Sequence, residues 1–523
     1  MRALLPLLAA SILSAQAPPV LEVPMRAHLA LLADDLLEGR GTGQRGGDLT
    51  VRYLETQLAV LGLKPVKNGS YLQKVPLHGL RTLPDRTSFS VEGGKAPLQP
   101  QLETDAILGT AQPKAELLFD APIVFVGYGV EASEERWDDF KGVDVKGRLL
   151  LMLVNDPQPT EEEPARFGGK AMTYYGRWTY KYEQALRHGA AGVLLVHTDA
   201  SATYSWSVVR NSWNGERFQH GGAAGNGLQG WITEAFAQRL FAAAGQDFAA
   251  LRRQAETRAF RPVELGLRWK GALRSQVRDL DQYNVAGLVP GTDSTLRAEA
   301  VLYSAHWDHF GRDAIHPERI YNGAVDNASG CAGLLAMAQA AAAKPAPRSQ
   351  VFLFVCGEEQ GLLGSEAYAA SPLWPLERTV ADLNLDSMNW VGATSDISLF
   401  GAERSTLLET GTVVAKAMGL EVAEIRPDTG GGYFRSDHFS LAKAGVPAFS
   451  VGGGRKWKSD PKGSQEKAAG FGKRYHQPAD RYDPSWDFSG MVQQAQFTLN
   501  LGYTLAAAPD RPAWKPGAKP PKP

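Results

Sequence analysis

Histidines and carboxylates follow several apolar runs in the second half of this 523-residue sequence. They are His306 and Asp308 in "VLYSAHWDHFG", Asp326 in "YNGAVDNASG", Glu358 and Glu359 in "VFLFVCGEE", Asp386 in "LNLDSMNW", and His476 in "RYHQPADRYD". If the fold gathers these groups, so many carboxylates would repel one another unless a cation neutralised them. The residue types therefore indicate a metal site.

The donor atoms narrow the choice of metal. Nitrogen and oxygen donors without a thiolate favour zinc, cobalt or manganese over calcium or magnesium, which prefer oxygen ligands alone. Five candidate ligands and one further carboxylate fit two ions that share a bridging carboxylate better than one ion. Two ions about 3.5 to 4 Å apart can hold a hydroxide between them and stabilise charge on a substrate oxygen. The chemistry indicated is hydrolysis.

The elements that must position these residues alternate between strand and helix after about residue 280. Short apolar runs predict strands in "YNVAGLV", "EAVLYSAH", "SQVFLFVC" and "TVADLNLD", and longer segments such as "SGCAGLLAMAQAAAA" predict helices. Continuous apolar runs are typical of strands buried on both faces, so we predict an α/β fold with a mostly parallel, mixed central sheet flanked by helices. Such sheets carry their sites at the carboxyl ends of strands, where these polar residues fall.

Changes in sequence pattern and composition along the chain predict several domains or segments. Two helices are expected within residues 26–64, and strand and helix signals in "APIVFVGYGV", "YKYEQALRHGA" and "AGVLLVHT" predict a smaller inserted α/β domain. The predicted boundaries are 18–114 for the first part of the main domain, 115–278 for the inserted domain, 279–508 for the main part with the metal site, and 509–523 for a disordered tail rich in Pro and Lys.

The N-terminus resembles an export signal. Met1 and Arg2 precede an apolar run and small residues follow in "SAQA", so residues 1–17 are predicted to be a signal peptide. No later run approaches the roughly 20 apolar residues of a membrane helix. With 55 basic and 56 acidic side chains, the net charge is −1, so the chain has no overall excess of positive charge for binding nucleic acid or an anionic membrane. We expect an exported protein, periplasmic or secreted, without nucleic-acid partners or membrane insertion.

Two cysteines, Cys331 and Cys356, are too few for a disulfide framework. Both lie in apolar runs, which favours buried free thiols over a single disulfide.

Five motifs together resemble a known family. "SAHWDHFG", "GAVDNASG", "GEEQGLLGS", "LNLD" and "HQPAD", in this order and spacing, are similar to the two-zinc exopeptidases that include secreted bacterial leucyl aminopeptidases and, more distantly, glutamate carboxypeptidase and the transferrin receptor. This resemblance covers residues 280–505 approximately. Residues from about 115 to 278 resemble the protease-associated domain often inserted in that family, notably in "FVGYGV" and "GVDVKGRLLLML".

The resemblance implies a role for each ligand of two Zn²⁺ ions, for which Co²⁺ or Mn²⁺ could substitute. Asp326 would bridge the ions, His306 and Asp386 would complete one site, and Glu359 and His476 the other. The family also implies a cis peptide bond after the bridging aspartate, between Asp326 and Asn327.

Three further residues receive catalytic roles. Asp308 lies two residues after His306, hence on the same face of a strand, where its carboxylate could accept the other ring N–H. Glu358 is the predicted general base, which needs a turn at Gly357 to bring both glutamates into the site. Tyr433 in "YFRSDHF" matches the family tyrosine that hydrogen-bonds the oxyanion. For His309 and His438, lining of the site and structural packing both remain open.

The sequence thus predicts an exported zinc-dependent aminopeptidase that hydrolyses N-terminal residues from peptides by a metal-bridged hydroxide, with Glu358 as general base. An inserted domain that caps the cleft would favour small, flexible peptides as substrates. The alternative is a carboxypeptidase of the glutamate type, which needs cationic groups such as Arg435 or Arg455. A glutaminyl cyclase, which uses one zinc ion, and a metal-free binding protein fit the complete ligand set less well.

Overall fold

The computed structural model describes residues 16–213, 215–221, 225–313 and 316–518. The predicted signal peptide falls almost entirely outside the described residues. The chain divides into two compact units. The first unit consists of Met1–Val75, Asp281–Arg426 and Arg435–Pro523, and the second unit consists of Pro76–Leu280 and Pro427–Phe434.

The first unit is built on a mixed sheet in the order β20-β17-β13-β16-β12. Strands β13, β16, β17 and β20 are parallel to one another, and β12 is antiparallel to β16. The strands of this unit are β1 (Lys64–Pro65), β12 (Val263–Val289, second half), β13 (Ala300–His306), β14 (Gly311–Arg312), β15 (Ile320–Tyr321), β16 (Ser349–Val355), β17 (Thr379–Asn384), β18 (Asp396–Ser398), β19 (Glu421–Val422), β20 (Ala448–Ser450) and β21 (Gly452–Gly453).

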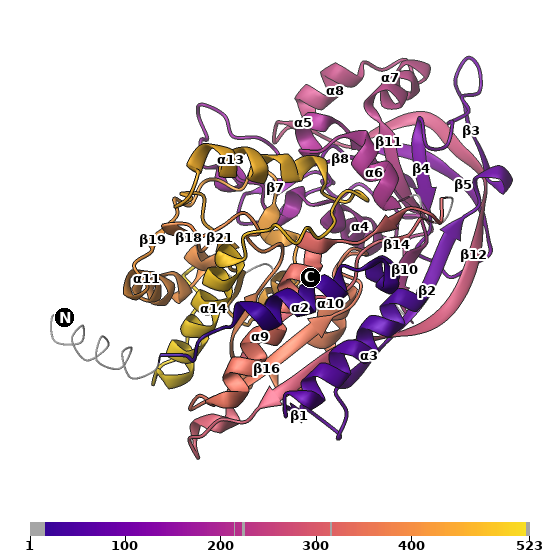
Figure 1. Cartoon of the computed structure of the whole chain (residues 1–523). Helices are drawn as coiled ribbons and strands as arrows, with labels where there is room; N and C mark the ends of the chain where they lie inside the picture. Colours follow the sequence, from indigo (N-terminus) through magenta and orange to yellow (C-terminus); the bar gives the residue numbers. More distant parts are fainter. Residues whose placement is uncertain (1–15, 214, 222–224, 314–315, 519–523) are drawn as a thin grey trace. The chain divides into compact units, whose positions relative to one another are not determined.

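Helices cover both faces of this sheet, which confirms the predicted α/β class. On β13, the Tyr303 hydroxyl lies against Gly502 of α14, whereas the neighbouring Ser304 points to the other face, toward Asp382 and Asn384. Figure 1 shows α2, α9 and α14 together, and α12 packs against β17 and β20. The helices are α2 (Glu22–Leu32), α3 (Arg45–Val60), α9 (Ser329–Ala343), α10 (Leu363–Ala370), α11 (Leu407–Ala417), α12 (His438–Lys443), α13 (Pro461–Gly470) and α14 (Ser489–Ala507).

The register of the sheet sets the site residues level with one another. Every residue of β13, β16 and β17 is buried, as the continuous apolar runs predict. His306 pairs with Val355, and Ser304 pairs with Asn384 on the other side. His306, the segment after β16 and the segment after β17 therefore meet at one edge.

The second unit has its own sheet, in the order β12-β5-β8-β9-β11-β4. Strands β5, β8, β9 and β11 are parallel, and β4 is antiparallel to β11. The elements are β2 (Leu72–Thr82), β3 (Ser88–Glu92), β4 (Ala106–Gly109), β5 (Glu116–Phe125), β6 (Glu131–Ala132), β7 (Trp137–Asp138), β8 (Leu149–Leu153), α4 (Trp178–Arg187), β9 (Gly192–His197), α5 (Asp199–Ala202), α6 (Trp206–Trp213), β10 (Arg217–His220), β11 (Leu228–Thr233), α7 (Glu234–Ala243) and α8 (Phe248–Ala255).

The second unit begins earlier than the predicted inserted domain. Residues 76–114, expected in the main domain, supply β3, which pairs with β12, and β4, which pairs with β11. The short segment Pro427–Phe434 also belongs to this unit, where the Met172 N–H donates to the Asp428 carbonyl at 2.7 Å.

The described part of the C-terminal tail, residues 509–518, is ordered, so the prediction of disorder is wrong there. The Arg511 guanidinium donates to the carbonyls of Glu377 and Thr379, and the Trp514 indole N–H donates to the Gly445 carbonyl at 3.0 Å. These two side chains hold a segment whose composition alone suggests none of these contacts.

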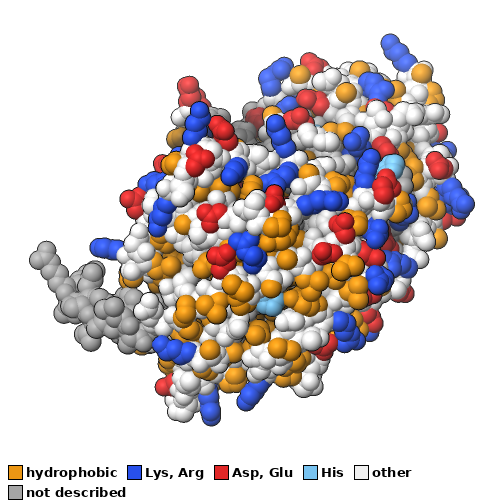
Figure 2. Space-filling view, in the orientation of Figure 1, with side chains coloured by type: hydrophobic (Ala, Val, Ile, Leu, Met, Phe, Trp, Pro, Cys, Tyr) orange, Lys and Arg blue, Asp and Glu red, His pale blue; other side chains and the backbone are white. Residues whose placement is uncertain are grey.

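On the face shown in Figure 2, basic and acidic side chains are interspersed, in keeping with the near-zero net charge. Among the described residues, no helix combines the length and hydropathy that a membrane span requires. Cys331 and Cys356 are buried free thiols, as predicted.

Candidate metal centre

The bridging aspartate lies in a tight turn before α9. Gly323 begins this turn with a φ of +55°, and a Cβ there would come within 2.1 Å of the Asp326 carbonyl oxygen. The Asp326–Asn327 peptide bond is cis, as the family resemblance implied. The main-chain N–H groups of Val325 and Asp326 both donate to the Asp480 carboxylate at 3.1 Å. Asp480 was missed as a positioning residue, although it ends the "HQPAD" motif.

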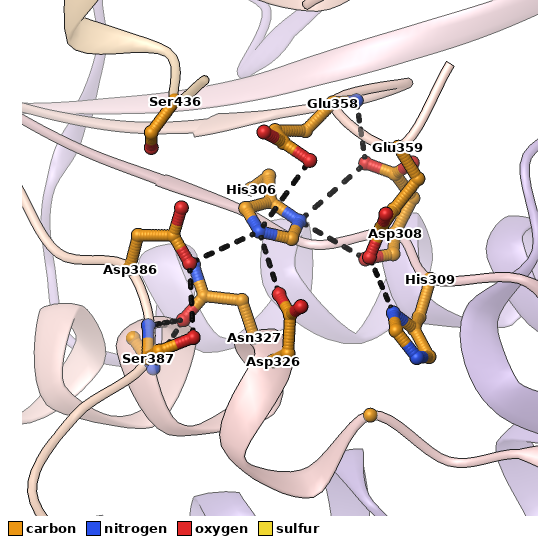
Figure 3. Close-up of polar contacts among 12 residues, drawn as sticks. His306, Asp308, His309, Asp326, Asn327, Glu358, Glu359, Asp386, Ser387 and Ser436 are labelled. Carbon is orange, nitrogen blue, oxygen red and sulfur yellow. Dashed lines mark hydrogen bonds and ion pairs between the residues drawn. The ribbon is translucent and has the colours of Figure 1, made fainter. Parts of the chain in front are cut away.

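Asp326 lies between two imidazoles (Figure 3 shows its approach to His306). Its Oδ1 is 3.2 Å from His306 Nε2, and its Oδ2 is 3.4 Å from His476 Nε2. Asp386 Oδ1 lies 3.5 Å from the same His306 nitrogen, and Glu359 Oε2 lies 3.1 Å from His476 Nε2. The structure thus brings the five predicted ligands together around one shared carboxylate.

His309, whose role the sequence left open, belongs to this cluster. Its Nδ1 is 2.5 Å from Glu359 Oε1. Two groups of ligand atoms lie close enough to hold an ion: His306, Asp326 and Asp386 in one, and His309, Asp326 and Glu359 in the other. Both His309 and His476 therefore reach the second group. The only sequence signal for His309 is its place three residues after His306.

The residues fit a divalent cation that accepts nitrogen and oxygen ligands. Within the described residues, His306 Nε2 is buried without a hydrogen-bond partner, yet it lies within 4.0 Å of carboxylate oxygens of Asp326, Asp386 and Glu358. Buried polar atoms normally have partners, so an unpartnered imidazole nitrogen that faces a surplus of acid groups indicates a site for a cation.

The adjacent glutamates differ in electrostatics. Gly357 has a φ of +66°, the turn that the prediction required. Burial raises the pKa of Glu358 well above its usual range, with Glu359 and Asp386 adding to the rise against the lowering effect of His306. Burial also acts on Glu359, but His476 and His309 lower its pKa to about 2. Glu359 therefore stays ionised, as a ligand must, whereas Glu358 readily holds a proton.

The predicted hydrogen bond from the His306 ring to the Asp308 carboxylate is not formed. His306 Nδ1 faces the main-chain carbonyl of Asp308 at 3.1 Å, whereas the carboxylate is 3.9 Å away. The strand ends at His306, so the two residues no longer share a face. The Asp308 carboxylate instead accepts the Glu358 N–H at 3.1 Å and the Thr42 hydroxyl at 3.2 Å. Asp308 thus holds the glutamate segment.

Tyr433 lies in the segment that belongs to the second unit. Its side chain is buried, its main-chain N–H donates to Asp428 Oδ2 at 3.0 Å, and its ring packs edge-on against Phe434. Its contact with an oxyanion stays a prediction. His438 is buried at the start of α12 in the first unit.

Comparison with known proteins gives the class of this site. Residues 284–499 match peptidase family M28. A probable leucine aminopeptidase of Arthroderma otae is 27% identical over 233 residues, which span 43% of this chain and 58% of that protein, less than two thirds of its length. An aminopeptidase from Aneurinibacillus sp. strain AM-1 has a similar structure, with a TM-score of 0.54 and 18% identity over 95% of this chain and 97% of that one. The zinc aminopeptidase BSAP from Bacillus subtilis gives a TM-score of 0.47 and 18% identity over 93% and 96%.

Residues 284–499 are therefore similar to peptidases of family M28. This confirms the resemblance carried by the five motifs. The likeness to the Aneurinibacillus structure confirms the fold, a large mixed sheet flanked by helices. The resemblance of residues 115–278 to a protease-associated domain stays a prediction.

Proposed function

We propose that this chain is an exported zinc aminopeptidase that removes N-terminal residues from small peptides. The observation that carries the proposal is the position of Asp326, whose two oxygens face two different imidazoles within one buried cluster. The names of the relatives, a probable leucine aminopeptidase, an aminopeptidase and a zinc aminopeptidase, support zinc and the cleavage of N-terminal residues.

The ligands divide into two sets. His306, Asp326 and Asp386 would hold one zinc ion, and Asp326 and Glu359 with His476 or His309 would hold the other. When bound, such ions polarise a water molecule and the substrate carbonyl.

Glu358 is placed to move the proton. Its Oε2 lies 4.0 Å from His306 Nε2, so the carboxylate faces the cluster without belonging to either ligand set. A raised pKa suits a group that takes a proton from the attacking water and returns it to the leaving amine. Asp308 supports this role because it accepts the Glu358 N–H and fixes the segment after Gly357.

Two parts of the proposal concern the second unit. Tyr433 would donate its hydroxyl hydrogen to the oxyanion of the tetrahedral intermediate. Residues 115–278 would form a protease-associated domain. Tyr433→Phe tests the first point, because it removes only the hydroxyl: kcat should fall while KM and metal content stay near the wild-type values.

A substrate panel tests the aminopeptidase assignment. The metal-stripped chain is reconstituted with Zn²⁺, Co²⁺ or Mn²⁺, and then assayed on aminoacyl anilides and on N-blocked dipeptides with a free C-terminus. Turnover of the anilides that depends on added metal, with two ions bound per chain, is expected. Cleavage of the blocked dipeptides alone would indicate a carboxypeptidase, and formation of pyroglutamate from a Gln-peptide would indicate a cyclase.

Export has its own test. The chain is expressed with its own N-terminus in a Gram-negative host, and the mature N-terminus is sequenced from the periplasmic fraction. Cleavage within residues 15–18 is expected, and an intact N-terminus retained in the cytoplasm would contradict export.

A further inference from the structure

A buried arginine outside the matched peptidase region clamps the chain around the metal centre. Arg40 ends a 3₁₀ segment (Asp35–Arg40) and is fully buried. Its Nε donates to the Trp307 carbonyl at 2.8 Å, its Nη1 to the carbonyls of Leu32 and Asn322 at 2.6 and 2.5 Å, and its Nη2 to the Gly323 carbonyl at 2.9 Å.

Three of the four carbonyls, those of Trp307, Asn322 and Gly323, belong to segments that lead to or follow metal ligands, whereas the Leu32 carbonyl ends α2. Trp307 follows His306 directly, and Gly323 begins the turn that carries Asp326. The main chain of Arg40 adds a further tie, since its carbonyl accepts the His309 N–H at 3.4 Å. One guanidinium thus fixes the His306 strand end and the Asp326 turn relative to each other, and a planar fork with five donors is the side chain that can do so.

The charge of Arg40 also matters to the cluster. All four of its acceptors are neutral carbonyls, so a hydrogen-bonded carboxylate does not cancel its charge. Burying a cation in this way is costly unless acid groups nearby compensate. Burial lowers the pKa of Arg40, and the charges of Asp480, Asp308 and Asp326 act against that shift. The cation in turn offsets the surplus of negative charge around the ligands.

We propose that Arg40 is a positioning residue of the metal centre: it holds the His306 and Asp326 segments in register and supplies a positive charge near the acidic ligands. This inference rests on the proposed metallopeptidase function. It predicts that loss of Arg40 weakens metal binding in a chain that is still folded.

The same unit offers a matched control. Arg348 is also buried, and its guanidinium donates to the carbonyls of Leu505 and Ala508 and to Glu299. It precedes β16, at the opposite end of that strand from Glu358 and Glu359. Arg348 therefore clamps chain segments as Arg40 does, but away from the ligands.

The experiment compares Arg40→Met, Arg40→Lys and Arg348→Met in the full chain. Zinc affinity is measured by competition with a chromophoric chelator, the ligand field by the visible spectrum of the Co²⁺ form, and folding by thermal unfolding. Arg40→Met should lose about 10- to 100-fold in affinity for at least one ion, in the range seen for outer-shell residues, with an altered Co²⁺ spectrum. Arg348→Met should lower the unfolding temperature but bind zinc as the wild type does.

Two further readouts keep the test decisive. Arg40→Lys retains the charge but not the fork, so its affinity should fall between those of the wild type and Arg40→Met. Guanidinium ion at low millimolar concentration should restore zinc affinity to an Arg40→Ala variant, whereas the same concentration of NaCl should not. If Arg40→Met does not fold, Arg40→Lys decides: wild-type zinc affinity and spectrum in that variant would overturn the inference.

The outcomes separate this inference from the proposed function. Equal zinc affinity in the wild type, Arg40→Met and Arg348→Met would leave the peptidase standing and reduce Arg40 to a structural clamp. A wild-type chain that binds two ions but cleaves no peptide would remove the proposed function and leave the affinity test of Arg40 in force. A wild-type chain that binds no metal would overturn both.

Discussion

Each unit of the molecule buries a cluster of charged side chains beyond the carboxyl ends of parallel strands, and the two clusters differ in how their polar atoms are satisfied. In the second unit, Lys181 of α4 is fully buried, and its Nζ donates to the carbonyls of Tyr128 and Asn155 at 2.6 and 3.0 Å. These carbonyls lie just beyond the ends of β5 and β8.

The acid groups of the second cluster are also satisfied by protein donors. Asp156 accepts the N–H and the hydroxyl of Thr173 at 2.8 and 2.5 Å. Asp139 accepts the N–H of Val130 and the indole N–H of Trp137 at 2.9 and 2.8 Å. The lysine donates to main-chain carbonyls and the two acid groups accept from other protein donors, so each charged group is hydrogen-bonded within the protein and the cluster ties loops together.

The first cluster has the opposite character. Its carboxylates outnumber its cations, and His306 Nε2, which faces several of them, lacks a hydrogen-bond partner among the described residues. Burial and charge alone are therefore poor guides to function. A more useful indication of a functional site is a group of buried ligand atoms whose charges and hydrogen bonds are not satisfied by the protein itself.

One isosteric substitution in each cluster tests the difference between the clusters most directly. Asp326→Asn removes the charge of the carboxylate that both ligand sets share, so we expect both ions to be lost, with a fall in affinity beyond the about 10- to 100-fold of outer-shell changes. Asp156→Asn should leave two ions bound and lower the free energy of unfolding by about 1–3 kcal/mol. Metal analysis of the two purified variants checks this. Two ions retained in Asp326→Asn would contradict the shared-ligand arrangement.

The next effect concerns Glu358, which faces the metal cluster without belonging to a ligand set. Glu358→Gln keeps the shape of the side chain but removes the proton acceptor, so kcat should fall by about 10²- to 10⁴-fold with metal content unchanged. Glu377→Gln, an exposed glutamate of the same unit, serves as the control. The measurement is kcat on the best aminoacyl anilide, and an undiminished kcat in Glu358→Gln would remove Glu358 from its role.

Sequence patterns located the elements and most ligands because both follow from local rules. Buried parallel strands require continuous apolar runs, and the turn after β16 requires a residue that tolerates a positive φ, which Gly357 supplies. The failures occur where tertiary contacts decide. Asp308 was misassigned because the alternation of a strand stops at His306, and Arg40 was missed because its role depends on carbonyls from segments distant in sequence.

Two features of the fold were not predicted. Strand β12 is 27 residues long, but only its continuously apolar end was predicted as a strand; in the rest, exposed and buried positions alternate, which fits a strand with one solvent-facing side. The order of residues 509–518 depends on Arg511 and Trp514, whose partners lie in other parts of the first unit. Amino-acid composition alone predicts neither the full length of β12 nor the order of this segment.

A smaller effect should follow from the corrected contact of Asp308. Asp308→Asn retains one oxygen acceptor, but it cannot serve both the Glu358 N–H and the Thr42 hydroxyl as well as a carboxylate does. We expect kcat to fall by about 10- to 100-fold, in the range of outer-shell residues, while KM stays near the wild-type value. Thr42→Val, which removes only the second contact, should have the smaller effect. An effect on zinc affinity without one on kcat would instead favour a role toward His306.

The smallest effect lies in the second cluster and appears as a pH dependence of stability. Burial lowers the pKa of Lys181 from 10.5 to about 7, and the charges of Asp156 and Asp139 offset only part of this decrease. Between about pH 7 and 10.5 the unfolded chain therefore holds a proton that the folded chain has released, so this group makes the free energy of unfolding rise with pH in that window.

Below pH 7 the acid groups of this cluster give the opposite slope. Burial raises the pKa of Asp139 to about 7 and that of Asp156 to about 6, so the folded state keeps protons that the unfolded state loses above about pH 4. Stability from this cluster should therefore fall toward pH 7 and rise again above it. Lys181→Met removes the rising limb, and urea unfolding of both chains from pH 5 to 10 measures the difference. A pH-independent difference between wild type and Lys181→Met would mean that Lys181 stays charged throughout, and that hydrogen bonds to two carbonyls suffice to keep a buried cation, as at Arg40.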